Sequence, residues 1–191
     1  GKSVDVACDL HTRLDKHSAI RLAKDLEHLQ LMWLEEPIPP ENIDTMAEIT
    51  RSTSVPICGG ENLYLRHGFR KVFEQQALDI IMPDIPKCGG LSECRKIAEM
   101  ADLYSIPFAP HNVSSPIGTM ASAQLFSTFG ELAWSTELFG PLLLTEEILQ
   151  EPLQYRDFAL QLPTAFDFVV IYCSVLNLPP DVTTIIHVRH S

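Results

Sequence analysis

The sequence lacks the cysteine pattern of a disulfide-stabilised protein. Its five cysteines are an odd number and form no CxxC pair or framework spacing. Such usage is typical of reduced thiols inside the cell, so we expect a cytoplasmic protein. The first residues, GKSVDVACDL, contain no long apolar run, and we expect no secretory signal peptide there.

Basic residues and long apolar segments are also scarce. The chain has 14 Lys and Arg against 25 Asp and Glu, a net charge of −11, and the basic residues form no cluster. A nucleic-acid partner is therefore not expected, because a phosphate-binding surface needs clustered positive charge. The most apolar stretch, residues 165–178, is too short to span a bilayer and contains Asp167. We therefore expect no membrane partner either.

What the sequence does have is a set of ionisable residues at nearly even spacing. Each one follows a short apolar run that reads as a buried strand, and the gaps between them are 26, 26, 23, 27 and 26 residues. The six residues are Asp9, Glu35, Glu61, Asp84, His111 and Glu137. A chain that ends each repeated strand with such a group places them at one edge of a parallel sheet, where enzymes of this architecture carry their sites.

Segments with helical periodicity separate the strands. They cover residues 15–29, 41–52, 65–76, 91–104 and 115–129, and Asp15 is a plausible N-cap for the first. Alternating strands and helices predict an α/β fold with a parallel sheet. An open doubly wound sheet and a closed (β/α) barrel are both possible, and the even spacing of functional groups favours the barrel.

Six strands are fewer than the eight of a closed barrel. We therefore predict a partial TIM-type (β/α) barrel of about six parallel βα units over residues 1–162, followed by an atypical tail of unknown role over residues 163–191. An incomplete barrel exposes strand edges, which makes self-association into a homo-oligomer possible.

Three of the six residues form a candidate metal site. Asp9, Glu35 and Glu61 end three successive strands, and carboxylate oxygens are the ligands that Mg²⁺ prefers. Any one of these acids alone would be interpreted as a helix cap or an ion-pair partner. Three in register predict a shared Mg²⁺ ion.

The histidines and the remaining acids supply candidate catalytic groups. His11 lies two residues after Asp9 and would point to the same side if the strand continued. His111 ends a later strand, and Asp84 could hydrogen-bond its second ring nitrogen and fix its tautomer. Glu137 could hydrogen-bond a substrate carboxylate, although an ordinary ion-paired acid is an equal alternative.

Lys87 and two glycine pairs near these groups are less specific signals. Lys87 is either a cation beside the metal carboxylates or a plain lysine at a helix start. The glycines at 59–60 and 89–90 are expected in turns that need positive φ.

The motifs that carry these residues resemble the enolase superfamily. The most similar group is the mandelate racemase subgroup, and within it the galactonate-dehydratase-like acid-sugar dehydratases. The resemblance covers roughly residues 3–162 and rests on DLH at 9–11, WLEEPIPPEN at 33–42, GGEN at 59–62, MPDIPKCGG at 82–90 and APHNVSSPIG at 109–118. The resemblance also implies that Glu35, the first glutamate of the EEP motif, is the metal ligand.

The resemblance implies a hydro-lyase that uses Mg²⁺ and a sugar-acid substrate. His111 would remove the C2 proton of an aldonate, and His11 would protonate the departing C3 hydroxyl to give a 2-keto-3-deoxy acid. The resemblance also implies an N-terminal capping domain and two barrel strands ahead of Asp9, which this sequence lacks. Two alternatives stay open: a racemase or epimerase of a 2-hydroxy acid, and a truncated paralogue without activity.

Overall fold

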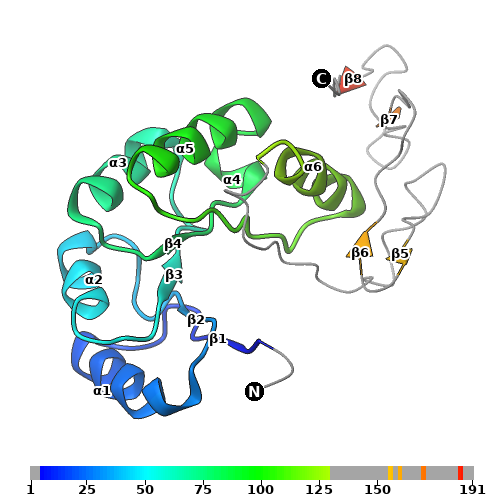
Figure 1. Cartoon of the computed structure of the whole chain (residues 1–191). Helices are drawn as coiled ribbons and strands as arrows, with labels where there is room; N and C mark the ends of the chain where they lie inside the picture. The colour runs from blue at the N-terminus through cyan, green and yellow to red at the C-terminus, as the bar shows by residue number, and fades with distance from the viewer. Residues whose placement is uncertain (1–4, 130–154, 157–158, 161–168, 171–184, 187–191) are drawn as a thin grey trace.

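The computed structural model describes residues 5–129 and four two-residue strands further along the chain (Figure 1). Those four strands are β5 (Tyr155–Arg156), β6 (Ala159–Leu160), β7 (Val169–Val170) and β8 (Ile185–Ile186). They pair antiparallel, β5 with β6 and β7 with β8. The proposed division of the chain near residue 162 falls among residues outside the described ranges and stays a prediction.

A four-stranded parallel sheet forms the centre of the described region. Its strands are β1 (Ala7–Asp9), β2 (Trp33–Glu35), β3 (Ile57–Gly59) and β4 (Ile80–Ile81), and they lie side by side in chain order. The order never reverses, whereas a doubly wound sheet has a reversal point in its strand order. The sheet therefore follows the barrel alternative of the sequence analysis.

Helices connect consecutive strands and cover the outer side of the row of strands (Figure 1). The structure places them at α1 (Lys16–Leu26), α2 (Ile43–Thr50), α3 (Leu65–Gln75), α5 (Leu91–Leu103) and α6 (Pro116–Phe126), each within a range predicted from the sequence. A 3₁₀ turn, η1 (Glu27–Leu29), extends α1, and the side chain of Asp15 caps α1 by accepting the N–H of Ser18. No described helix is both long and apolar enough to cross a bilayer.

A short additional helix, α4 (Ile85–Cys88), was not predicted from periodicity. Four residues are too few to show a helical repeat. Its N-cap is Asp84, whose carboxylate accepts the backbone N–H of Lys87 at 2.9 Å. The cap fixes the backbone next to Asp84, which matters for the site below.

The fifth predicted strand is present as two parallel bridges beside β4. Ile81 pairs with Phe108, and Asp84 pairs with His111. The sixth strand, which would end at Glu137, lies outside the described residues.

Side chains of the sheet alternate between two apolar layers. Leu34, Ile57 and Ile81 belong to the large core shared with the helices. Residues next to them in sequence face the other way, and a smaller cluster there contains Trp33, Cys58, Ile80, Met82 and Ala109. Because side chains alternate along a strand, this second face is also the one toward which Glu35 projects. In a barrel it is the inner face.

Gly60 lies in a turn after β3, at a position that has no room for a larger side chain. Its φ is +118°, and a Cβ built on it would lie 2.8 Å from Cε1 of Phe69 in the core. Gly90 also has positive φ, +85°, but a Cβ there would meet no atom within 4 Å. Alanine variants at the two positions therefore distinguish the cost of backbone strain, which both share, from the cost of steric overlap, which only Gly60 has.

We expect Gly60→Ala to destabilise the protein more than Gly90→Ala. Both variants acquire strain of about 1–3 kcal/mol, and Gly60→Ala adds about 1–3 kcal/mol of overpacking against Phe69. Urea unfolding of the two variants measures the difference. Equal losses would show that Phe69 moves aside without cost.

Candidate functional site

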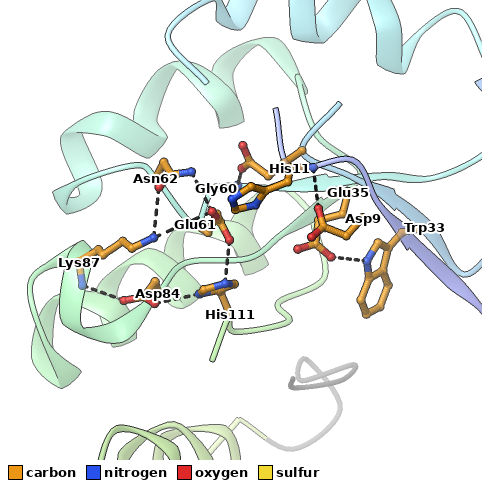
Figure 2. Close-up of polar contacts among 11 residues, drawn as sticks. Asp9, His11, Trp33, Glu35, Gly60, Glu61, Asn62, Asp84, Lys87 and His111 are labelled. Carbon is orange, nitrogen blue, oxygen red and sulfur yellow. Dashed lines mark hydrogen bonds and ion pairs between the residues drawn. The ribbon is translucent and has the colours of Figure 1, made fainter. Parts of the chain in front are cut away.

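Five of the six spaced residues gather at the carboxyl-terminal end of the parallel strands. Asp9 and Glu35 are register partners in β1 and β2, and Glu61 follows β3 by two residues. Asp84 and His111 pair across the next two strands. Figure 2 shows the five side chains in one group.

Asp9 lies at the exposed end of this group, and a tight turn follows it. β1 ends at Asp9, and both His11 (φ 48°) and Thr12 (φ 61°) adopt left-handed backbone conformations. The backbone N–H of His11 donates to Oδ1 of Asp9 at 2.7 Å. The strand ends at Asp9, so the alternation that would place His11 on the same side as Asp9 does not extend to it. The exposed side chain of His11 still lies in the group drawn in Figure 2, and its catalytic role stays a prediction.

Glu35 is buried, with 4% of its surface exposed. The indole Nε1 of Trp33, two residues earlier on the same face of β2, donates to its Oε2 at 2.9 Å. A neutral donor orients this carboxylate without cancelling its charge. Trp33 was not singled out in the sequence, although strand alternation places it beside Glu35.

Glu61 is also buried and contacts both His111 and Asn62. Its Oε2 lies 2.7 Å from Nε2 of His111, and its Oε1 accepts the amide Nδ2 of Asn62 at 2.8 Å. The hydrogen bond with His111 is the main reason that the pKa of Glu61 is lowered to about 2, and nearby Lys87 adds to it. Glu61 is thus held as a carboxylate.

Asp84 and His111 form the predicted hydrogen bond, 2.8 Å between Oδ2 and Nδ1. Burial alone would raise the pKa of Asp84. The hydrogen bonds from His111 and from the backbone of Lys87 outweigh burial and lower the pKa below its usual value. Both ring nitrogens of the buried His111 therefore contact carboxylates, so the ring orientation is fixed from two sides.

Lys87 lies in α4, and its side chain extends toward the site. Its Nζ donates to Oδ1 of Asn62 at 3.1 Å and lies 3.9 Å from Oε1 of Glu61. The lysine is therefore a cation near one predicted metal carboxylate, the first of the two sequence interpretations.

Glu36 is a buried acid to which sequence reasoning gave no role. It is 1% exposed, and its Oε1 accepts the backbone N–H of Gly60 at 2.5 Å. Burial is the largest cause that raises the pKa of this carboxyl, opposed by the Gly60 hydrogen bond. The glycine pair at 59–60 was a sequence signal for this contact, because a backbone that packs closely against a buried side chain requires glycine.

The donor set fits Mg²⁺ in its chemistry. Asp9, Glu35 and Glu61 supply carboxylate oxygens from three adjacent strands, and hard oxygen donors suit this ion. Among the described residues, however, no three His, Cys, Asp or Glu side chains are arranged to hold a metal, and Glu61 faces His111. The shared ion stays a prediction. Glu137, the remaining candidate, lies outside the described residues.

Comparison with known proteins identifies the family. A model of enolase C-terminal domain-like proteins matches residues 1–166. The chain belongs to this family. In the crystal structure of a mandelate racemase/muconate lactonizing enzyme-like protein from Rubrobacter xylanophilus, 46% identical, the same fold is seen with a TM-score of 0.79 over 85% of this chain and 42% of that one. The partial (β/α) barrel and the resemblance noted in the sequence are thereby confirmed.

Curated relatives of this enolase-like chain include two kinds of enzyme. A D-xylonate dehydratase from Haloferax volcanii is 55% identical over 65% of this chain and 30% of its own length. A D-galactonate dehydratase from Variovorax paradoxus is 38% identical over 64% of this chain and 32% of its own length. A muconate cycloisomerase from Acinetobacter lwoffii is 40% identical over 83% of this chain and 42% of its own length. The chain thus spans less than half the length of these relatives.

Proposed function

We propose that this chain carries the catalytic barrel segment of a Mg²⁺-dependent sugar-acid dehydratase. The reaction removes the C2 proton and the C3 hydroxyl of an aldonate, and it releases water and a 2-keto-3-deoxy acid. The observation that carries the proposal is His111, whose Nδ1 lies 2.8 Å from the buried Asp84 at the end of parallel strands. The dehydratase names of two relatives support the substrate class.

In this proposal His111 takes the C2 proton on Nε2. A base must have its accepting nitrogen free of a proton and aimed at the substrate. Asp84 supports both requirements, because it holds the proton of Nδ1 and fixes the ring. Oε2 of Glu61 now faces Nε2, so substrate binding requires this pair to separate.

His11 would protonate the departing C3 hydroxyl. Its left-handed turn places it on the exposed side of the site, where the backbone is anchored by Asp9. An exposed imidazole can reach a bound substrate and donate a proton to it. Glu137 remains our candidate for binding the substrate carboxylate.

Asp9, Glu35 and Glu61 would hold the magnesium ion. When bound, Mg²⁺ supplies electrostatic stabilisation for negative charge that develops on the substrate carboxylate. Lys87 and Trp33 would keep two of these carboxylates charged and oriented, through the contacts described above.

A panel of aldonates tests the proposal. We expect a 2-keto acid product from at least one sugar acid, with turnover lost on EDTA treatment and restored by Mg²⁺. The same reactions in D₂O, followed by NMR at C2, separate the alternatives. Deuterium at C2 without keto acid would indicate a racemase or epimerase.

Thermal melting with and without Mg²⁺ tests the non-catalytic alternative. We expect the ion to raise the Tm, because a ligand that binds only the folded state stabilises it. A folded chain that is indifferent to Mg²⁺ and inactive on the whole panel would contradict the proposed function.

A further inference from the structure

Glu36 joins the ends of the three strands that carry the predicted metal carboxylates. Its backbone N–H donates to the carbonyl of Cys58 in β3 at 3.0 Å, and its carbonyl accepts the N–H of Thr12, just after β1, at 2.6 Å. Its side-chain Oε1 accepts the N–H of Gly60 at 2.5 Å. A single residue at the end of β2 therefore holds the chain beyond β1 and beyond β3.

The conformation of Glu36 is costly in two ways. Its φ is 38°, a left-handed value for a residue with a side chain. Among the described residues, its Oε2 is a buried side-chain oxygen with no hydrogen-bond partner. Backbone strain and an unsatisfied buried polar atom each reduce stability. Such outliers cluster at functional sites, where the surrounding structure holds them in place.

Gly59 provides the space that the Glu36 carboxylate occupies. A Cβ at position 59 would lie 2.9 Å from Oε1 of Glu36. The segment Gly59–Gly60 is thus fitted around the Glu36 side chain.

We propose that Glu36 is a positioning residue that fixes the Gly60–Glu61 backbone and thereby holds the Glu61 carboxylate in place for magnesium. Glu36 acts through Gly60 and is not itself a ligand. The magnesium part of this inference rests on the proposed function, whereas the backbone part rests on the contacts alone.

Glu27 offers a matched control at the opposite end of β3. Its Oε1 accepts the backbone N–H of Ser54 at 2.8 Å and the hydroxyl of Thr53 at 3.1 Å. Glu27→Ala and Glu36→Ala therefore each remove a carboxylate that holds a backbone N–H of the chain near β3. Only Glu36 does so beside Glu61.

Two measurements on the full chain test the inference. Amide hydrogen exchange reports the protection of residues 60–61, and calorimetric titration reports Mg²⁺ affinity. In Glu36→Ala we expect faster exchange at these amides and Mg²⁺ affinity weakened about 10-fold or more, the effect typical of losing an outer support of a ligand. Glu36→Gln keeps a carbonyl acceptor and is expected to stay within about threefold of wild type.

Glu27→Ala is expected to lose protection at Ser54 and to leave Mg²⁺ affinity unchanged. If Glu36→Ala does not fold, Gly59→Ala is the second variant. It keeps Glu36 but displaces the carboxylate, and we expect it to show the same faster exchange and weaker binding.

Unchanged exchange at Gly60 in both Glu36→Ala and Gly59→Ala would overturn the inference. Equal loss of Mg²⁺ affinity in Glu27→Ala would also overturn it, because the effect would then be general destabilisation. A wild-type chain that binds no Mg²⁺ contradicts the proposed function instead. In that case exchange alone decides: protection lost in Glu36→Ala and kept in Glu36→Gln supports the backbone role, and any other pattern rejects it.

Discussion

His111→Asn is expected to lower kcat for 2-keto-acid formation by about 10²–10⁴-fold, the range contributed by a general base. Asparagine is small and polar enough for the site, but it cannot accept a proton at neutral pH. It also removes both imidazole contacts of the site, the one with Glu61 and the one with Asp84. Steady-state kinetics on the best aldonate of the panel, at saturating Mg²⁺, measures the effect.

The matched control for this variant is His67→Asn. His67 is exposed on α3, and its replacement is expected to leave kcat unchanged. A melting curve for each variant separates loss of the base from loss of the fold. A folded His111→Asn protein that keeps kcat within a few-fold of wild type would remove His111 from the mechanism.

Glu35→Gln is expected to weaken Mg²⁺ binding by more than about 100-fold, beyond the range typical of outer-sphere changes. The amide keeps the size of Glu35 but loses its negative charge, and Mg²⁺ binds carboxylates far better than neutral amides. Because Glu35 is buried in β2, no exposed acid can easily move into its place. Calorimetric titration of the purified chain gives the affinity.

Trp33→Phe provides a graded comparison for the metal prediction. It keeps an aromatic ring in the inner apolar cluster but removes the Nε1 donor to Glu35, so we expect a loss of about 10-fold. Glu99→Gln, on the exposed face of α5 where Glu99 pairs with Arg95, is the charge-matched control and is expected to change nothing. A Glu35→Gln protein with wild-type affinity would exclude Glu35 as a ligand.

The sequence by itself determined most of the secondary structure and the order of the strands. Helix periodicity and the Asp15 cap depend on residues within a few positions of each other, so they are readable without tertiary contacts. Even spacing of the strands also predicted that the six spaced residues meet at one edge of the sheet, and five of them, Asp9, Glu35, Glu61, Asp84 and His111, are among the described residues. The hydrogen bond between Asp84 and His111 follows directly from that register.

Local sequence was not sufficient where the backbone leaves regular geometry. Strand alternation does not reach His11, because a left-handed turn begins there. The short helix α4 is fixed by the carboxylate of Asp84 and not by a periodic pattern. In both cases one side chain bonded to a nearby backbone N–H overrides the repeat.

Only the tertiary structure decided which partners Glu61 and Glu36 take. Glu61 faces His111, 50 residues away, and Glu36 holds Gly60, 24 residues away. Adjacent glutamates in the sequence, Glu35 and Glu36, consequently have different surroundings, the first beside an indole donor and the second against a glycine backbone. The physical reason is that burial leaves each carboxylate only those donors that strand register brings within reach, and register is a property of the assembled sheet.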